Sequence, residues 1–164
     1  ILNIKNNLQK SFFSITKINF IYLIPFILIF FQIILGALVS GLDAGKIYQT
    51  WPLMGNHYVP DDFVSNKIIS FFDFNNHSLV QFYHRNFAYL ITLYIFVLFF
   101  YIIRNKEKNL YKPIFLLVSF LVLQIVLGIF SLLSDLNIWI ASAHQISSVI
   151  LILTALNLYY SRIN

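Results

Sequence analysis

Two histidines stand in similar surroundings in two apolar parts of the sequence. His84 lies in VQFYHRNFAYL, and His144 lies in ASAHQISSVILIL. Each follows a Gln-x-x-x-Gly motif, QIILG at 32–36 and QIVLG at 124–128. An imidazole can ligate a metal or transfer a proton, and an ionisable side chain inside a membrane segment is costly enough to indicate function. The pattern therefore predicts a functional site built from two related segments.

Four long uncharged intervals surround these motifs. The chain of 164 residues is 59% hydrophobic and only 10% charged, whereas soluble domains carry about 25% charged residues. Each interval is close to the ~20 residues that a helix needs to cross the hydrocarbon core. The predicted fold class is all-α, an integral membrane four-helix bundle forming a single domain over 1–164. Its helices are expected at about 18–42, 79–103, 113–134 and 137–160, with an outer loop at 41–78.

The order of the motifs predicts that the bundle consists of two repeated helical hairpins. In each hairpin a helix with the Gln-x-x-x-Gly motif is followed by a helix with a histidine. At 1.5 Å per residue, His84 lies about 8 Å and His144 about 10 Å from the outer ends of their helices. Gly36 and Gly128 lie at about the same level, so the four residues are expected to share one layer in the outer part of the bundle.

The basic residues give the orientation. They precede the first helix, fill the loop between the second and third helices at 104–112, and recur at Arg162. By the positive-inside rule both termini lie on the cytoplasmic or matrix side, and the histidine layer faces the periplasm or intermembrane space. This placement accounts for the net charge of +5 without a nucleic-acid partner. There is no cysteine, and no phosphate-binding loop, H-E-x-x-H or G-x-S-x-G motif.

The chemistry that suits such a layer is haem binding. Two neutral imidazoles from facing helices can ligate haem iron, one on each face, and helix bundles commonly hold cofactors in this way. His84 and His144 are therefore the predicted axial ligands. Gly36 and Gly128 would let the helix backbone approach the flat macrocycle. Arg85 would pair with a haem propionate.

Other interpretations of the same residues remain open. Each histidine could instead hydrogen-bond to a neighbouring helix, as could Gln32 and Gln124. Arg85 could extend toward the lipid headgroups, and the glycines could serve helix packing. Lys46 and Lys67 in the outer loop are weaker candidates for a propionate. The outer loop is long and rich in aromatic residues, which predicts a segment packed on the outer membrane face rather than disorder.

The run GALVSGLDAGKIYQTWPLMGNHYVPDDF, followed by LVQFYHR and later by AHQ, resembles the haem A synthase family of cytochrome oxidase assembly. The resemblance covers roughly 26–158 and corresponds to the carboxy-terminal half of an eight-helix protein with two pseudo-symmetric halves. It implies oxidation of the C8 methyl of haem O to the formyl of haem A, with His84 and His144 as the paired ligands of a haem b cofactor. The matching residues of the signature loop, for which a positional role is expected, are Asp43, Tyr48, Thr50, Trp51 and Pro52.

The resemblance also implies what this chain lacks. The amino-terminal half, with the family's second histidine pair and its mechanistic carboxylate, is not in the sequence, and catalytic residues stay unassigned. A fragment, a split gene and a relic would each explain this, and a chain that begins with Ile1 favours the first.

The implied partners are haem O, the lipid bilayer, the amino-terminal half in cis or as a separate chain, a haem O synthase and a second copy of the chain. The membrane would be the bacterial plasma membrane or the mitochondrial inner membrane. Two alternatives are a bis-histidine b-type cytochrome without catalysis of its own and a haem-free assembly scaffold.

Overall fold

The structure is a computed structural model that describes residues 16–60 and 72–163. The described chain forms four long helices, α2 (Lys17–Gly41), α3 (His77–Arg104), α4 (Tyr111–Leu133) and α5 (Ile138–Ile163). Two short 3-10 helices, η1 (Ala44–Lys46) and η4 (Lys108–Leu110), lie in the connections. The long helices begin and end one to three residues from the predicted ranges. Residues 61–71, which include Lys67, are outside the described part of the chain.

Local chemistry explains where two of the helices begin. The Thr16 hydroxyl accepts a hydrogen bond from the Asn19 amide at 3.2 Å, and the Asn76 side chain accepts one from the Leu79 amide at 3.0 Å. Each side chain satisfies an amide of the first turn that has no partner within the helix. Pro25 lies inside α2, where neighbouring helices can compensate for its missing amide.

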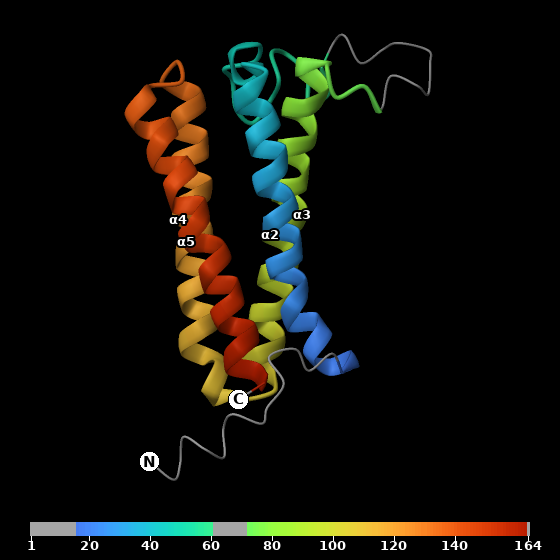
Figure 1. Ribbon diagram of the computed structural model, residues 1–164, viewed down its shortest axis with the longest axis vertical. Helices are drawn as coiled ribbons and strands as arrows, with labels where there is room; N and C mark the ends of the chain where they lie inside the picture. The colour runs from blue at the N-terminus through green and yellow to red at the C-terminus, as the bar shows by residue number, and fades with distance from the viewer. Residues whose placement is uncertain (1–15, 61–71, 164) are drawn as a thin grey trace.

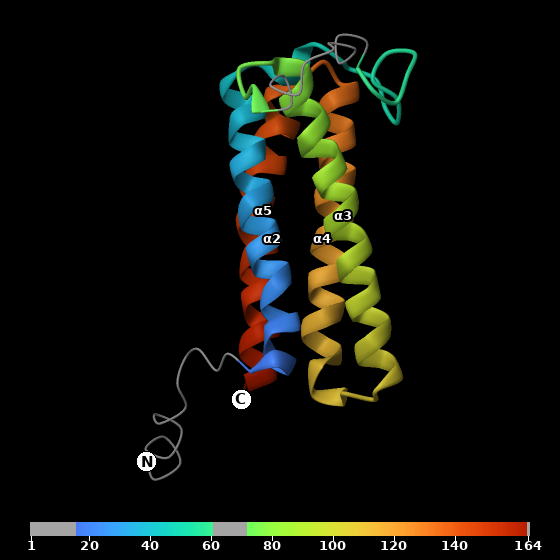
Figure 2. The same ribbon diagram turned by 90° about the vertical axis from the view of Figure 1, so that its right-hand side faces the viewer.

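The helices pair as α2 with α3 and α4 with α5, while α2 also packs on α5 and α3 on α4 (Figures 1 and 2). We call the end of the bundle with the α3–α4 turn and the last turn of α5 the terminal end. The opposite end, with residues 42–60 and the α4–α5 turn, is the loop end. The two helix pairs lie closest at the terminal end and separate toward the loop end (Figure 1).

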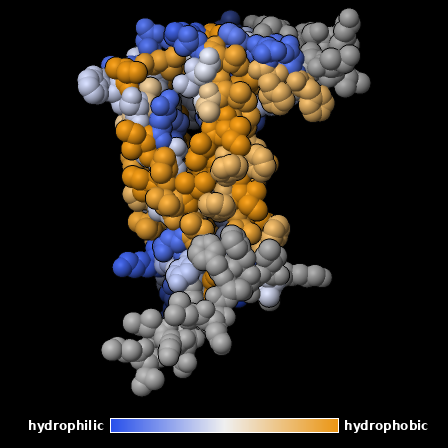
Figure 3. Space-filling view, in the orientation of Figure 1, coloured by the Kyte–Doolittle hydropathy of each residue, from blue (hydrophilic) through white to orange (hydrophobic). Residues whose placement is uncertain are grey.

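All four helices are long and apolar enough to cross a membrane. Hydrophobic side chains form a broad band between two more hydrophilic ends (Figure 3). A helix is a suitable spanning element because all of its backbone groups are hydrogen-bonded within the segment. The predicted class, an all-α membrane four-helix bundle, is confirmed.

The apolar core fills only the terminal half of the bundle. Its buried members come from residues 22–29 of α2, 91–102 of α3, 110–121 of α4 and 151–159 of α5. Dispersion between closely packed side chains holds helices together in a membrane. The terminal half therefore holds the two helix pairs to each other.

Candidate functional site

The core ends at one level on all four helices. Its last members toward the loop end are Ile29, Ile91, Leu121 and Leu151. Seven residues further along each helix, about 10 Å toward the loop end, a different set of residues occupies the interior positions. These are Gly36, His84, Gly128 and His144. The histidine layer thus lies beyond the packed core, where the two helix pairs separate (Figure 1).

His84 is supported by α2. Gln32 donates through Nε2 to the His84 carbonyl oxygen at 3.0 Å, and the same nitrogen lies 3.2 Å from Nδ1 of the imidazole. A Cβ atom placed on Gly36 would lie 3.1 Å from Cε1 of the ring. One turn of α2 therefore holds both the backbone and the ring of His84.

His144 is supported by α4 in the same way. Gln124 donates through Nε2 to the His144 carbonyl oxygen at 2.9 Å, and a Cβ on Gly128 would lie 2.9 Å from Cε1 of the ring. In addition, Nδ1 of His144 lies 3.1 Å from the backbone oxygen of Gln124. The same Nδ1 also lies 3.1 Å from Nε2 of Gln124, so the tautomer decides which ring nitrogen carries the proton, and the other keeps the lone pair that a metal ligand requires.

The two imidazoles are each half-buried. The described residues contain no cluster of three or more His, Cys, Asp or Glu that could hold a bare metal ion. A haem iron needs only two axial ligands from the protein. Paired histidines with neighbouring glycines fit that group better than they fit a free ion.

Both glycines make room for the histidine rings themselves. Cβ atoms almost never come within 3.0 Å of another heavy atom, so any residue larger than glycine at position 128 would displace the His144 imidazole. The sequence predicts that Gly36 and Gly128 face the macrocycle, whereas their close contacts in the structure are with imidazole. A contact of these glycines with a bound haem remains a prediction.

Arg85 holds the segment that follows α2. Its Nη1 donates to the carbonyl oxygens of Thr50 at 2.9 Å and Leu53 at 3.3 Å, and its Nη2 donates to the Tyr48 carbonyl at 2.8 Å. Gln81, one turn earlier on α3 and 3% exposed, donates to the same Tyr48 oxygen at 2.8 Å. Arg85 therefore does not simply extend toward the headgroups.

Residues 42–60 are folded and tied to α3. The Thr50 hydroxyl donates to the Leu53 carbonyl and accepts from the Gly55 amide, both at 2.9 Å. The hydroxyl of Tyr58 donates to Asn86 at 2.5 Å, and Met54 is buried at 1% exposure. The signature-loop match therefore corresponds to an ordered structure over the histidine helix, as the aromatic content predicted.

The remaining signature-loop residues lie at the surface of this segment. Asp43 has a left-handed backbone with φ of 53° and pairs with Lys46 at 3.1 Å. Both side chains are more than half exposed, so the pair adds little stability. Trp51, next to Pro52, is 44% exposed.

The loop end also joins the two helix pairs. Gln49 donates to Asp135 in the α4–α5 turn at 2.5 Å, and Gln145 of α5 donates to the Ser40 hydroxyl of α2 at 3.3 Å. Leu136 packs so closely on Gly45 that a Cβ there would lie 3.2 Å from its side chain. The histidine layer is thus bounded by the core on one side and by these contacts on the other.

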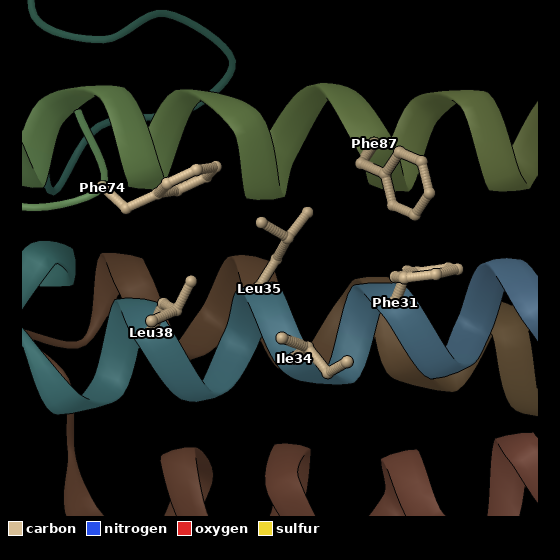
Figure 4. A pocket seen from close by; sticks show the side chains of 6 residues that line it. All are labelled: Phe31, Ile34, Leu35, Leu38, Phe74 and Phe87. Atoms are coloured by element: carbon tan, nitrogen blue, oxygen red, sulfur yellow. The ribbon is translucent and has the colours of Figure 1, made fainter. Parts of the chain in front are cut away.

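An apolar groove of about 480 Å³ lies between α2 and α3 near this layer (Figure 4). Phe31, Leu35 and Leu38 of α2 face Phe87 of α3, and Phe74 closes the groove at the loop end. None of these side chains can ligate iron. The groove itself therefore supplies no ligand for iron.

Sequence reasoning missed several residues of this site. Gln81, Asn86, Gln49 and Asp135 had no role assigned, and Ser147 was not considered. Ser147 donates to Oε1 of Gln124 at 2.5 Å. One signal was available: Gln81 lies one helical turn before Arg85, so both face the same side of α3.

The family of cytochrome oxidase assembly proteins described as COX15-CtaA matches residues 2–156. The chain belongs to this family. A haem A synthase of Pelagibacter ubique is 38% identical over 137 residues, which cover 84% of this chain and 40% of that protein. A haem A synthase of a Wolbachia strain from Brugia malayi is 42% identical over 125 residues, 76% of this chain and 36% of that protein.

A third relative, the haem A synthase of Rickettsia bellii, is 36% identical over 140 residues, 85% of this chain and 39% of that protein. The chain thus spans about two fifths of the length of the curated relatives that it matches. No solved structure matches. The family and the four apolar helices together make this an integral membrane protein.

Proposed function

We propose that this chain is the carboxy-terminal, haem b-binding half of a haem A synthase. The complete protein would oxidise the C8 methyl of haem O to the formyl of haem A for cytochrome oxidase assembly. The family match and the names of the relatives support this activity. Because those relatives are more than twice as long as the matched region, oxidation by this half alone is not part of the proposal.

A single observation carries the haem proposal. His84 and His144 come from different helix pairs, and both stand seven residues beyond the level at which the apolar core ends. In a membrane bundle an interior layer without core side chains is otherwise costly, since packing contacts are lost there. A flat apolar macrocycle between the two helix pairs would restore those contacts.

Two histidines and two glutamines would hold the haem. His84 and His144 would ligate the iron through nitrogen, with Gln32 and Gln124 holding their backbones. A haem with two histidine ligands supplies one-electron transfer, because both axial sites are occupied and no small molecule can bind the iron. This half would therefore accept or deliver electrons for an oxidation carried out elsewhere in the complete protein.

Arg85 would contribute in a second way. Its guanidinium gives three hydrogen bonds to loop carbonyls, and a guanidinium has five donors. The propionate contact expected for Arg85 can use only the remaining N–H groups. We therefore infer that Arg85 mainly holds residues 48–53 in place above the histidine layer.

The proposal also includes the orientation of the bundle in the membrane and an amino-terminal half of the complete protein. Arg104, Lys106, Lys108, Lys112 and Arg162 gather at the terminal end, so that end would face the cytoplasm or matrix. The histidine layer would then face the periplasm or intermembrane space. The matching contacts in α2–α3 and α4–α5 support the two-hairpin repeat. The greater length of the relatives supports a second, amino-terminal set of four helices in cis or in trans.

Visible spectra of the purified chain test the haem proposal. We expect sharp low-spin bands after dithionite reduction that carbon monoxide does not change, as two axial histidines require. His84→Ala and His144→Ala should each lose the low-spin bands and gain carbon monoxide binding. His77→Ala, at the start of the same helix as His84, is the matched control and should keep the wild-type spectrum. A chain that retains the unchanged spectrum in either site variant contradicts the proposal.

The runner-up is a bis-histidine b-type cytochrome without catalysis of its own, because the paired histidines His84 and His144 alone would suffice for it. Co-expression with an amino-terminal half from a haem A synthase separates the two. Formation of haem A that depends on His84 and His144 supports the synthase. Spectrally intact haem without haem A formation supports the cytochrome.

A further inference from the structure

A polar pocket of about 470 Å³ lies at the terminal end, far from the histidine layer. It is formed by the α3–α4 turn and the last turn of α5. Its lining residues are Lys106, Glu107, Lys108, Asn109, Leu110, Ser161 and Arg162. Three of these side chains are cationic and one is anionic, so the pocket is positively charged.

The single carboxylate of the pocket is already engaged by the protein. Glu107 accepts a hydrogen bond from the Tyr22 hydroxyl on Oε2 at 2.6 Å, and its Oε1 lies 3.6 Å from Nη1 of Arg162. The Arg162 guanidinium also lies over the Tyr22 ring, 5.1 Å from its centroid. Glu107 therefore joins α2, the α3–α4 turn and α5, and it leaves the two lysines without an acidic partner in the pocket.

Arg162 keeps donors that Glu107 does not use. A separation of 3.6 Å is an ion pair but too long for a hydrogen bond. Nε of Arg162 is buried, and no acceptor for it occurs among residues 16–60 and 72–163. The Arg162 side chain is 28% exposed and lines the pocket, so its other guanidinium nitrogens can reach a further anionic group there.

The lysines are held in place by a tight turn. Lys106 has a left-handed backbone with φ of 55°, a conformation that glycine or asparagine adopts far more readily than lysine. Its amide donates to the Ile103 carbonyl at 3.1 Å, and the Lys108 amide donates to the Lys106 carbonyl at 2.8 Å. This left-handed residue ends α3, with the Glu107 amide donating back to the Ile102 carbonyl at 3.2 Å, so the turn fixes the backbone that carries both lysines.

The position of the pocket identifies its ligand class. It lies between the ends of three membrane-spanning helices, where the phosphates of lipid headgroups are found, and basic pockets between helices bind such phosphates. We propose that this pocket binds the phosphate of an anionic phospholipid headgroup, through Lys106, Lys108 and Arg162. A lipid held here would join the α3–α4 turn to α5 at the end that holds the helix pairs together.

Lipid retention tests this proposal on the full chain. The protein is reconstituted in nanodiscs of mixed phosphatidylglycerol and phosphatidylcholine, and the lipids that stay bound after transfer to detergent are counted by native mass spectrometry. We expect selective retention of phosphatidylglycerol by the wild type. Lys106→Gln/Lys108→Gln should retain about thirtyfold less, since each of the two basic groups contributes about 1 kcal/mol and every 1.4 kcal/mol is about tenfold in affinity.

Arg104→Gln/Lys112→Gln is the matched control, because it removes the same charge at the same end of the bundle from residues that do not line the pocket. It should retain lipid as the wild type does. Equal loss in both double variants would show only general attraction to an anionic surface and overturn the site. Binding of inorganic phosphate by the wild type without any selective retention of phosphatidylglycerol would assign the pocket to free phosphate and overturn the lipid proposal. The visible spectrum should be unchanged in both variants, so this test is independent of the haem proposal.

Discussion

The α2–α3 and α4–α5 pairs support their histidines through the same two contacts, yet they differ in how fully the supporting glutamine is bonded. Gln124 donates a hydrogen bond through Nε2 to the His144 carbonyl oxygen and accepts one from the Ser147 hydroxyl on Oε1. Gln32 also donates through Nε2 to the His84 carbonyl oxygen. Its Oε1, however, is buried, and no hydrogen-bond donor for it occurs in the described residues. The α4–α5 pair is thus the more completely hydrogen-bonded of the two.

One position explains this difference. Three residues after His144 stands Ser147, whereas three residues after His84 stands Phe87, which lines the apolar groove instead (Figure 4). The His144 ring also lies against a backbone oxygen, that of Gln124, and among the residues that the structure describes no such contact is found for the His84 ring. Similar motifs thus give similar backbone geometry, while single neighbouring residues decide how rigidly each imidazole is held.

The largest expected effect concerns the residue after each histidine. Arg85→Ala removes three hydrogen bonds from a charged donor, and we expect about 3 kcal/mol less stability for the docking of residues 48–53. The corresponding change in the other pair, Gln145→Ala, removes one long bond of 3.3 Å and should cost well under about 1 kcal/mol. Amide hydrogen exchange of residues 48–55, measured in the Arg85→Ala and the Gln145→Ala variants, compares how firmly this segment is docked in each. Equal protection in the two variants would mean that Arg85 does not hold the loop.

The glycines come next. Gly128→Ala places a Cβ 2.9 Å from the His144 ring, compared with 3.1 Å at Gly36. We expect about 2 kcal/mol loss of thermal stability for Gly128→Ala and about half of that for Gly36→Ala, typical of overpacked sites. Gly41→Ala, where nothing lies within 4 Å, is the control and should be neutral or slightly stabilising. The reverse order at positions 36 and 128 would contradict the geometry.

The two glutamines give a smaller contrast. Gln124→Met removes bonds to both Ser147 and the His144 backbone, and we expect a loss of about 1.5 kcal/mol, near the upper range for hydrogen bonds between membrane helices. Gln32→Met removes one bond and also a buried oxygen without a partner, so its cost should stay below about 0.5 kcal/mol. Thermal unfolding of the detergent-solubilised protein compares them. Similar losses would show that Oε1 of Gln32 has a partner in solution.

A last substitution should make the two pairs alike. Ser147→Ala removes the hydrogen bond to Oε1 of Gln124, so that this oxygen, like Oε1 of Gln32, has no donor. We expect a loss of about 1 kcal/mol of stability. In a double-mutant cycle with Gln124→Met, the two changes should be strongly non-additive because they share one hydrogen bond. Additive changes in the unfolding midpoint would mean that the 2.5 Å contact contributes nothing to stability.

Much of the fold was predictable because it depends on local composition. Uncharged runs between charged clusters mark the spans, and a helix is the structure that satisfies the backbone of such a run in lipid. The level shared by His84, His144 and the two glycines was also predictable, since helical rise converts sequence position directly into depth.

The contacts across the loop end were not predictable. The site of Arg85 depends on the path of residues 42–60, whose turns bring three carbonyls to one guanidinium. The Gln49–Asp135 contact joins residues 86 positions apart. Neither composition nor periodicity carries information about such a path.

The sequence by itself determined the four helices, their apolar character and the depth of the histidine layer, because these follow from hydrophobicity and a constant rise per residue. Only the tertiary structure decided what each polar group of that layer contacts. It showed the glycines against imidazole, Arg85 on loop carbonyls and Ser147 completing Gln124. The physical reason is that hydrogen bonds and close contacts depend on distances of a few tenths of an ångström between separate helices, and these are set by packing rather than by position along the chain.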